Sequence, residues 1–306
     1  MNVQNDILVS VVIPTYKREA ECLSKAINSV FAQTYKNTEI IVVDDSPSTY
    51  EKRNEVKIYI SSLADKNVIY LQNEKNIGGS LTRNRGIEAS HGKYITFLDD
   101  DDWYTPEKIE TQLNFMIKND CDASLSNTIM CKNGNPVEVR DFKDISAFDK
   151  KSLLHYHLLH HLTGTSTYMF KADKLRKIGG FDDALCGQEF ILMLKAIEGD
   201  LKIRYMDVNH VFHTISSKGS ISFSKNKIQG EKNLYKIKCR YFHELSKSEI
   251  RYIKFRYHAI MAIAYKRNSM YIQMIGEGLT AVATAPGVFL NECFSLLKNT
   301  LEQRKK

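Results

Sequence analysis

The first hundred residues alternate between short apolar runs and segments in which apolar residues recur at helical spacing. The apolar runs are rich in β-branched residues, which is typical of buried strands. They are Ser10–Pro14, Glu39–Asp45, Asn67–Asn73 and Lys93–Leu98. Glu19–Thr34 and Ser80–Ser90 lie between them and read as helices. Strands and helices that alternate in this order predict a mostly parallel sheet covered by helices on both faces.

The middle of the chain is less regular. A helix is expected to begin at Thr105 and Pro106, because proline suits the first helical position. From Cys121 to Asp149 the sequence is polar and weakly patterned, and no element is predicted there. Gly164–Leu185 predicts a strand, a short helix and a turn, and Phe190–Ile197 predicts a buried helix.

After Ser224 the spacing of apolar residues becomes helical throughout. Four sets of apolar residues mark helices, and the last two predict a closing helix pair that is broken at Pro286. The sets are Leu234, Ile237 and Tyr241; Ile250, Ile253 and Ile260; Ile272, Ile275, Leu279 and Val282; and Phe289, Cys293 and Leu296. The pattern predicts an α/β domain over residues 1–224 and a helical region over residues 225–306.

Charge is distributed unevenly between these two parts. The whole chain has a formal charge of +7, yet the segment after Ser224 carries 16 Lys and Arg against 6 Asp and Glu. The preceding residues hold 27 basic against 30 acidic side chains. Basic segments attract the phosphates of nucleic acids or of anionic lipids. A solvated helix face is the alternative interpretation of this basic region.

The spacing of the cysteines and the lengths of the apolar runs indicate the cellular compartment in which the protein is expected. The six cysteines are widely spaced and form no CxxC pair, which fits a reduced compartment and disfavours a zinc ribbon. The N-terminus lacks the pattern of a secretory signal, and no apolar run approaches the roughly 20 residues that span a bilayer. We therefore expect a cytoplasmic protein, at most peripheral on the cytoplasmic face of the membrane.

Candidate chemistry gathers just beyond the expected strand ends, where parallel sheets bind their ligands. Four consecutive aspartates, Asp99–Asp102, follow the fourth strand. Carboxylates this close raise one another's pKa unless a cation intervenes, and Mg²⁺ and Mn²⁺ prefer carboxylate oxygens. The cluster predicts a metal–diphosphate site. An acidic turn before the helix at Thr105 is the alternative.

Three stretches share an order and spacing with one known family: VSVVIPTYKR, EIIVVDDSP and NIGGSLTRNRGIEASHGKYITFLDDDDWYTPEK. They resemble the family 2 glycosyltransferases of the GT-A fold, and GGFDDALCGQEFILMLKAI resembles that family's acceptor-site segment. The resemblance covers about residues 8–215. It implies a Rossmann-like α/β domain that binds nucleotide over about residues 8–104 and acceptor over about 105–224. It also implies a nucleotide-sugar donor, a divalent metal (Mn²⁺ or Mg²⁺) and inverting transfer.

The resemblance also implies roles for individual residues around the donor. Pro14, Thr15 and Tyr16 would border the nucleotide, and Asp45, supported by Asp44, would accept a hydrogen bond from the base, typically uracil. Arg83 would face the nucleotide or its diphosphate. Asp99 and Asp101 would be the DxD carboxylates, with Asp101 the main metal ligand and Asp100 near the ribose. His213 would lie near the metal, with an ordinary core histidine as the alternative.

The acceptor side departs from the family's pattern. The family usually has a Glu-Asp pair whose Asp is the general base, and this chain has Gln188 and Glu189. Glu189 is the predicted base, since the acceptor hydroxyl must lose a proton as it attacks. A helix N-terminal acid is the alternative interpretation of Glu189, and Asp182 and Asp183 are the nearest competitors for the role of base. Asp182, Trp103 and Gln188 are expected at the acceptor site.

These residues are compatible with two enzymatic functions and one non-catalytic function. A metal-dependent glycosyltransferase that uses a UDP-sugar and acts on a glycan or lipid-linked acceptor in surface polysaccharide synthesis is favoured. A sugar-nucleotidyl transferase would be expected to carry a Gly-rich, basic loop where VVIPTYKREAE stands. A non-catalytic nucleotide- or nucleic-acid-binding protein would use the basic C-terminal part, but no nucleic-acid partner is expected. The C-terminal helices are open to three roles: core packing, homo-oligomerisation or contact with an anionic membrane.

Overall fold

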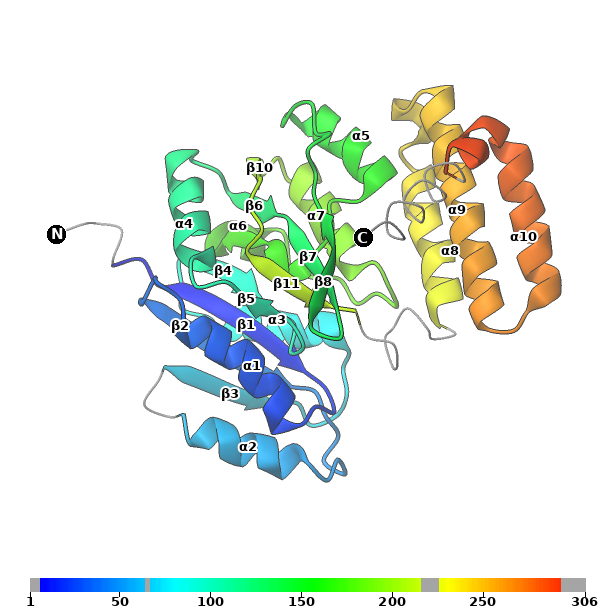
Figure 1. Cartoon of the computed structure of the whole chain (residues 1–306). Helices are drawn as coiled ribbons and strands as arrows, with labels where there is room; N and C mark the ends of the chain where they lie inside the picture. The colour runs from blue at the N-terminus through cyan, green and yellow to red at the C-terminus, as the bar shows by residue number, and fades with distance from the viewer. Residues whose placement is uncertain (1–5, 64–66, 216–225, 293–306) are drawn as a thin grey trace. The chain divides into compact units, whose positions relative to one another are not determined.

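The computed structural model describes residues 6–63, 67–215 and 226–292. They form two compact units, each described here by itself (Figure 1). The sheet unit comprises Met1–Leu154, Leu162–Asp183 and Gln188–Ser216. The helical unit comprises His155–His161, Ala184–Gly187 and Ser217–Lys306.

A seven-stranded sheet in the order β10-β6-β9-β4-β1-β2-β3 forms the centre of the sheet unit. All neighbouring strands are parallel except β9, which runs antiparallel to both β4 and β6. The mostly parallel sheet expected from the sequence is therefore confirmed. The strands are β1 (Val9–Thr15), β2 (Thr38–Asp44), β3 (Val68–Gln72), β4 (Tyr94–Phe97), β6 (Ala123–Ser126), β9 (Met169–Lys171) and β10 (Ile203–Met206).

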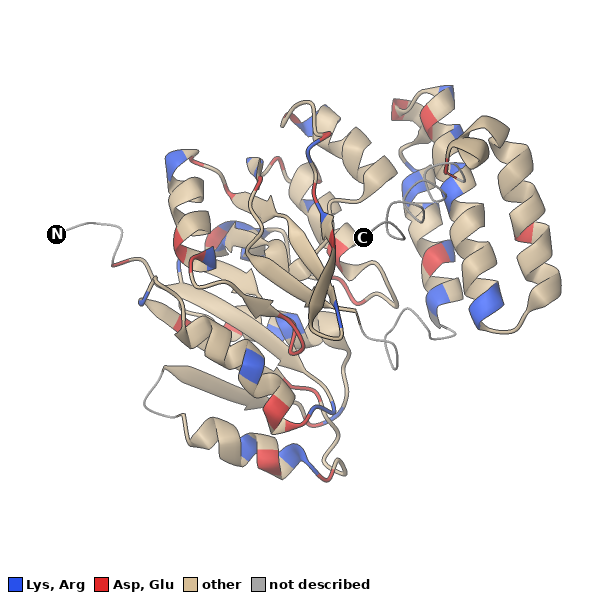
Figure 2. Ribbon diagram, in the orientation of Figure 1, with Lys and Arg blue, Asp and Glu red and all other residues tan. Residues whose placement is uncertain are grey.

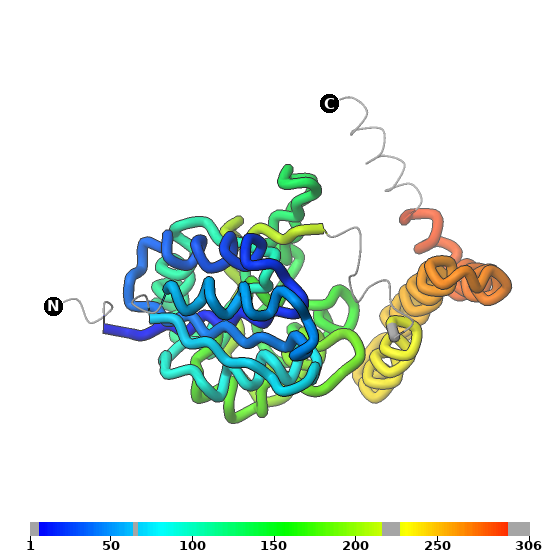
Figure 3. The backbone as a smooth tube through the Cα atoms, turned by 90° about the horizontal axis from the view of Figure 1, so that it is seen from below, coloured from blue at the N-terminus to red at the C-terminus, as the bar shows by residue number. Residues whose placement is uncertain are grey.

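The alternation of side chains along β1 shows why helices are needed on both faces. Val9, Val11 and Ile13 point into a core cluster shared with α1, α2 and α4. Val12 points the other way, and a Cβ added to Gly86 of α3 would lie 2.4 Å from its methyl carbon. Glycine at residue 86 therefore lets α3 approach the second face closely. Figure 3 shows α1 and the strands in separate layers.

Helices of the sheet unit include α1 (Ala20–Phe31), α2 (Arg53–Ser61), α3 (Gly79–Ala89), α4 (Lys108–Lys118), α6 (Ala172–Lys177) and α7 (Gln188–Glu198). All of these except α2 lie close to where the sequence predicts a helix. The helix α4 begins two residues after Pro106, and α2 has no counterpart in the sequence reading. Gly164–Leu185 holds the strand β9 and the short helix α6, as expected, and a 3-10 turn that was not predicted precedes them.

Cys121–Asp149, for which no element was predicted, is more regular than its weak pattern indicates. This segment contains three strands, and two of them belong to a smaller sheet in the order β5-β11-β7-β8. Its strands are β5 (Trp103–Tyr104), β7 (Thr128–Lys132), β8 (Asn135–Arg140) and β11 (Val211–Thr214). The strand β8 is exposed along its whole length, so it has no buried apolar face for the sequence to display. Because β11 pairs with β5, the small sheet brings residues near 213 beside those near 103.

Three helices build most of the helical unit, and α9 lies between α8 and α10 (Figure 1). They are α8 (Asn226–Cys239), α9 (Lys247–Arg267) and α10 (Tyr271–Thr284), and α5 (Lys150–His160) ends in this unit. The helix α9 starts at a capping box, in which Ser246 and Glu249 each bond the other's backbone N–H. The helix α8 ends before Tyr241, which the spacing had assigned to it.

The helix α10 is present, but it buries almost none of its apolar side chains. Ile272 is 86% exposed and Leu279 is 68% exposed, whereas Ala281 is the residue of α10 that is buried. A small cluster of Phe255, Ala281 and Ala285 joins α9 to α10. Lys and Arg lie along α8 and α9, and the described part of α10 carries none (Figure 2). Among the described residues, no helix combines the length and apolarity needed to cross a bilayer.

Candidate active site

The carboxyl ends of β1, β2 and β4 lie at one edge of the large sheet, because these strands are parallel. Thr15 ends β1, and the four aspartates follow β4. The Thr15 hydroxyl donates a hydrogen bond of 2.8 Å to Asp100 Oδ2, across 85 residues of sequence. The sheet thus brings the first and third of the sequence motifs together, as the prediction of a strand-end site requires.

Two of the four aspartates pair with an arginine that the sequence reading did not single out. Arg18 Nε lies 3.0 Å from Asp100 Oδ1, and Arg18 Nη2 lies 2.5 Å from Asp101 Oδ2. Burial raises the pKa of Asp100 to about 6, although the positive charge of Arg18 opposes that shift. Arg18 follows directly after VVIPTYK, and that position beside the first strand end was the signal available in the sequence.

Arg83 joins the aspartates to the segment that carries the predicted base. Its Nη2 lies 2.5 Å from Asp99 Oδ1, and its Nη1 donates to Gln188 Oε1 at 3.2 Å. Burial disfavours the charged form of Asp99, but the adjacent guanidinium outweighs this and lowers the pKa of Asp99 overall. A Cβ at Gly79 would lie 3.1 Å from Arg83 Nη1, so a side chain there would crowd this arginine.

Asp102 is the aspartate that the prediction left without a role, and the structure pairs it with His213. The Asp102 side chain is 1% exposed, and its Oδ2 lies 3.1 Å from His213 Nδ1. Ser166 Oγ and the backbone N–H of Thr214 also donate to this carboxylate, both at 3.0 Å. The bond to Asp102 raises the pKa of His213 to about 9, against the opposing effect of burial. A carboxylate on Nδ1 fixes the ring and leaves Nε2 as the nitrogen for another partner.

The donor atoms at this edge fit a hard divalent cation that completes its shell with phosphate oxygens. Among the described residues, no three His, Cys, Asp or Glu side chains converge as a preformed metal site. Mg²⁺ and Mn²⁺ are commonly bound through one or two carboxylates together with substrate phosphates. Asp101 and Asp99 supply such carboxylates, and each is paired with an arginine side chain. The two carboxylates therefore fit a metal that binds with its diphosphate ligand, and the predicted metal contacts of Asp101, Asp99 and His213 stay predictions.

Asp44 and Asp45 are buried, and the carboxylate of each accepts hydrogen bonds from backbone N–H groups. Asp45 is 3% exposed and accepts hydrogen bonds from the N–H groups of Ile77 and Gly78, at 2.8 and 2.9 Å. Asp44 accepts from the Ser46 N–H at 2.9 Å and from the Tyr70 hydroxyl at 2.8 Å. These bonds shape the loop that leads into α3, where Gly78 has a φ of +84° that favours glycine. A direct bond from Asp45 to a base stays a prediction.

The aromatic residues at the strand ends differ in exposure. The Tyr16 side chain is 43% exposed beside the half-buried Pro14, so it is available to border a nucleotide. Trp103 stacks on Phe212 with ring centroids 5.0 Å apart, and Lys25 Nζ lies 3.1 Å from the Trp103 ring centroid. Trp103 is thus held by packing within the small sheet, and its predicted contact with acceptor stays a prediction.

The predicted acceptor residues divide into two groups. Glu189 lies in the first turn of α7, half-buried, and its negative charge contributes to raising the pKa of Arg83. Asp182 instead forms a surface ion pair with Lys195, at 2.5 Å, with 53% of its own side chain exposed. The structure therefore brings Gln188 and Glu189 to the arginine that holds Asp99, and it directs Asp182 toward solvent.

A buried lysine underlies the site and was missed by the sequence reading. Lys108 is 1% exposed, its Nζ donates to Thr96 Oγ1 at 2.5 Å, and it lies 4.2 Å from the Tyr104 ring centroid. Burial lowers the pKa of Lys108 well below its ordinary value. Nothing in the helical spacing of α4 distinguished this lysine from an exposed one.

Comparison with known proteins places this site in a family. A family model described as Glycosyl transferase family 2 matches residues 10–176. An uncharacterized glycosyltransferase of Methanocaldococcus jannaschii is 32% identical over 197 residues, which are 64% of this chain and 66% of that protein. The Escherichia coli enzyme named UDP-Glc:alpha-D-GlcNAc-diphosphoundecaprenol beta-1,3-glucosyltransferase WfgD is 32% identical over 133 residues, 44% of this chain and 50% of that protein. These matches span between half and two thirds of the relatives' lengths.

Solved structures agree on the fold. Staphylococcus aureus TarS in complex with UDP-GlcNAc has a TM-score of 0.62 at 18% identity, over 85% of this chain and 72% of that chain. The mannosyltransferase PcManGT of Pyrobaculum calidifontis, in complex with GDP-Man and Mn²⁺, has a TM-score of 0.56 at 16% identity, over 94% and 79% of the two chains. At such identities the likeness concerns the fold alone. With its family model covering more than half of the sequence, this chain belongs to glycosyl transferase family 2 and has the GT-A fold.

Proposed function

We propose that this protein is an inverting glycosyltransferase of surface polysaccharide synthesis. It would move a sugar from a nucleotide-sugar, most simply a UDP-sugar, to a hydroxyl of a glycan or a lipid-linked acceptor. The observation that carries the proposal is the bridge made by Arg83, which contacts Asp99 of the acidic cluster and Gln188 beside the predicted base. One side chain thereby connects the residues assigned to the donor with those assigned to the acceptor.

The donor side would be formed by the first strand end and the acidic cluster. Thr15 and Tyr16 lie beside Asp100, and the paired arginines Arg18 and Arg83 supply positive charge for a diphosphate. The name of the relative WfgD mentions UDP-Glc, and the structural neighbour TarS binds UDP-GlcNAc, which supports a uridine donor. A structural neighbour bound to GDP-Man makes a guanosine donor the second choice.

A divalent ion, Mn²⁺ or Mg²⁺, held by Asp101 and Asp99 near His213, would supply Lewis-acid stabilisation of the leaving diphosphate. The chain's own residues prepare that position. Asp102 orients the His213 ring through Nδ1, and Arg83 orients the Asp99 carboxylate. Arg18 and Arg83 would share in stabilising the negative charge that develops on the departing phosphate.

Glu189 would act as the general base. In a single displacement the acceptor oxygen bonds to the anomeric carbon as the bond to the diphosphate oxygen breaks, so the anomeric configuration inverts. The acceptor hydroxyl proton would pass to the Glu189 carboxylate. Gln188 would position this segment through Arg83, and Trp103 and Asp182 are proposed at the acceptor site.

The acceptor and the cellular location follow by analogy with the named relative that uses a diphosphoundecaprenol-linked sugar. A lipid-linked acceptor would bring the protein to the cytoplasmic face of a membrane, where the basic helical unit would meet anionic lipid. Co-sedimentation with liposomes tests this step. Liposome binding that does not depend on the content of anionic lipid would contradict the proposed membrane contact. Self-association through the C-terminal helices is the other role proposed for them, and sedimentation velocity measures it.

The deciding experiment is calorimetric binding of UDP, GDP and CMP, each with and without Mn²⁺. Wild-type protein is compared with Asp101→Asn, which keeps the size of the side chain and removes its charge. We expect one nucleotide to bind in a manganese-dependent way and the variant to lose that binding. Asp141→Asn is a matched control, since Asp141 is an exposed aspartate outside the candidate site.

Hydrolysis and transfer assays with the matching nucleotide-sugar then separate catalysis from binding. Nucleotide binding by the wild type without turnover of any donor would favour the non-catalytic alternative. Binding that Asp101→Asn leaves unchanged would contradict the assignment of the acidic cluster.

A further inference from the structure

Arg18 lies in the turn between β1 and α1, and the backbone of this turn is held in place. Lys17 has a φ of +50°, a left-handed conformation that is uncommon for a residue with a side chain. The Lys17 N–H donates to Ser46 Oγ at 2.8 Å, which ties the turn to the end of β2. From this position the Arg18 side chain reaches the acidic cluster that follows β4.

The guanidinium group of Arg18 contacts one oxygen of each of two aspartates. Its Nε lies 3.0 Å from Asp100 Oδ1, and its Nη2 lies 2.5 Å from Asp101 Oδ2. The other oxygen of Asp100 accepts a hydrogen bond from the Thr15 hydroxyl. Asp101 is the predicted main ligand of a divalent cation, so Arg18 and that cation would draw on the same carboxylate.

The two arginines of the site differ in how readily they can change partners. The Arg83 side chain is 12% exposed, and it also donates to the Gly79 carbonyl at 3.3 Å and to Gln188 Oε1 at 3.2 Å. The Arg18 side chain is 37% exposed, and that of Asp101 is 24% exposed. A solvent-exposed ion pair contributes little to stability, because water screens it. Arg18 can therefore leave Asp101 at little cost, whereas Arg83 is held by three partners.

Electrostatics makes the binding of a metal to this cluster depend on what else is bound. A divalent cation on Asp101 would lie next to the guanidinium group of Arg18, and two positive groups at such short range repel each other strongly. A diphosphate reverses this balance, because its oxygens can bind an arginine and a divalent cation at the same time. The metal would therefore gain most when a diphosphate arrives with it.

We propose that Arg18 makes the binding of metal and the binding of nucleotide depend on each other. Arg18 pairs with Asp100 and Asp101 until a nucleoside diphosphate binds. It then transfers to the diphosphate oxygens and leaves the Asp101 carboxylate to the metal. A divalent cation alone is bound weakly, and metal and nucleotide enter and leave together. This inference rests on the proposed function, because it takes Asp101 as the metal ligand and a nucleotide-sugar as the donor.

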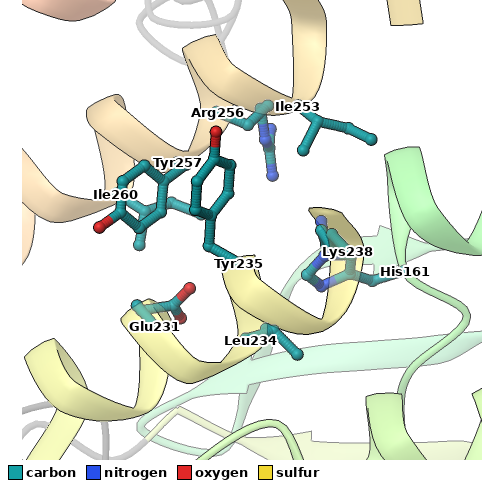
Figure 4. Close-up of a pocket in the computed structure, with 9 residues that line it drawn as sticks. All are labelled: His161, Glu231, Leu234, Tyr235, Lys238, Ile253, Arg256, Tyr257 and Ile260. Carbon is teal, nitrogen blue, oxygen red and sulfur yellow. The ribbon is translucent and has the colours of Figure 1, made fainter. Parts of the chain in front are cut away.

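The charged side chains in the pocket of the helical unit have a different setting (Figure 4). Glu231 and Lys238 are each 7% exposed there, and the rings of Tyr235 and Tyr257 stack with centroids 4.1 Å apart. Buried charges among packed side chains cannot change partners unless the packing opens. We therefore infer the exchange of partners for Arg18, whose ion pair with Asp101 reaches solvent.

The first test is the binding of Mn²⁺ alone to the full chain, followed by the electron paramagnetic resonance signal of free Mn²⁺. Arg18→Gln removes the guanidinium charge and should tighten this binding by about tenfold, because the repulsion is lost. Arg18→Lys keeps a positive charge and should gain at most about twofold. A residue that only supports the fold could not strengthen metal binding when it is replaced. Asp101→Asn identifies the site, since it should lose this Mn²⁺ binding.

The second test is calorimetric titration with UDP and with GDP, each without Mn²⁺ and at saturating Mn²⁺. The ratio of the two nucleotide affinities is the coupling factor, and the same factor relates the two affinities for Mn²⁺. Arg18→Gln should lower this factor by about tenfold, because Mn²⁺ then binds more tightly to the protein without nucleotide and equally well to the nucleotide complex.

Arg140→Gln is the matched control for both tests. Arg140 also faces an acid, with its Nε 3.7 Å from Glu138 Oε1, and it lies outside the candidate site. Its replacement should leave the affinity for Mn²⁺ and the coupling factor unchanged. Circular dichroism verifies that each variant is folded.

The outcomes distinguish this inference from the proposed function. A coupling factor that Arg18→Gln leaves unchanged would overturn the inference and leave the proposed function intact. Weaker binding of Mn²⁺ alone to Arg18→Gln would also overturn it, because Arg18 would then support the metal site. A wild-type protein that binds neither nucleotide in the presence of Mn²⁺ would overturn both.

Discussion

In the sheet unit, β1 and β2 bury nearly every side chain, and the charged groups at the strand ends are matched with partners of opposite sign. In the helical unit, α10 exposes Ile272 and Leu279. Apolar side chains are therefore placed in opposite ways in the two units. A sheet covered on both faces has room to bury every apolar residue, whereas one helix packed against another buries only a narrow stripe.

This difference indicates which side chains of each unit could contact a ligand or a partner. The sheet unit pairs Asp99, Asp100 and Asp101 with arginines, so an incoming diphosphate and its metal would exchange one set of ion pairs for another. The helical unit leaves apolar side chains of α10 exposed. Its stability and its contacts should therefore respond to ligands and pH differently from those of the sheet unit.

The largest expected effect tests whether chemistry belongs to the sheet unit alone. Glu189→Gln should lower the rate of sugar transfer by about 10³-fold, because removing a general base costs roughly 10²- to 10⁴-fold. Nucleotide affinity should stay within about twofold of the wild type, since the amide keeps the shape of the side chain. Single-turnover transfer and calorimetry measure the two quantities. Asp183→Asn is a control on a neighbouring exposed acid. Undiminished transfer in Glu189→Gln would assign the base elsewhere.

A second prediction concerns the acidic cluster. Asp101→Asn should reduce transfer by about 10²-fold through lost stabilisation of the leaving diphosphate. Its effect on the thermal midpoint should be small, because the Asp101 carboxylate is 24% exposed and the Arg18 guanidinium is 37% exposed. Rates at several Mn²⁺ concentrations provide the measurement. A variant as active as the wild type at every concentration would contradict the assignment of Asp101 as a ligand.

A matched pair of substitutions compares the two units in stability. Ile95→Ala, at a fully buried residue of β4, should lower the free energy of unfolding by about 3 kcal/mol. Ile272→Ala, at 86% exposure on α10, should change it by less than about 0.5 kcal/mol. Denaturant titrations of both variants measure the difference. A large loss for Ile272→Ala at the protein concentration used would mean that the α10 face is covered in solution.

The smallest expected effects are opposite pH dependences in the two units. The pKa of His213 is raised to about 9, so its contribution to stability is complete below its ordinary value of 6.5 and is lost as pH rises through about 9. The pKa of Lys238 is lowered to about 8 from 10.5, so the unfolded chain binds more protons over that interval and stability rises with pH.

The pH prediction is measured with thermal midpoints of His213→Gln and Lys238→Met between about pH 6 and about pH 10.5. The loss of stability in His213→Gln relative to the wild type should shrink as the pH rises through about 9. The midpoint of Lys238→Met should gain on the wild type at low pH and lose that gain above about pH 8. Parallel profiles for all three proteins would show that neither group is shifted in the folded state.

The sequence by itself determined where β1, β2, β3 and β4 lie along the chain. These strands are buried in the sheet, and burial requires the short apolar, β-branched runs that the sequence displays. The sequence also determined the family, through motifs at the strand ends. It failed for Cys121–Asp149, since β8 is exposed on both faces and has no hydrophobic period to detect. Helical spacing likewise identified α10 without showing that its apolar face would lie open.

Only the tertiary structure decided which charges meet. Arg18 is about eighty residues from its aspartates in sequence, and Arg83 lies more than a hundred residues from Gln188. Asp102 and His213 are brought together by the pairing of β5 with β11, which no local pattern encodes. Strand and helix formation depends on neighbours in sequence, whereas ion pairs depend on the distance between side chains after the chain has folded. The motifs therefore located the site, and the fold determined its electrostatics.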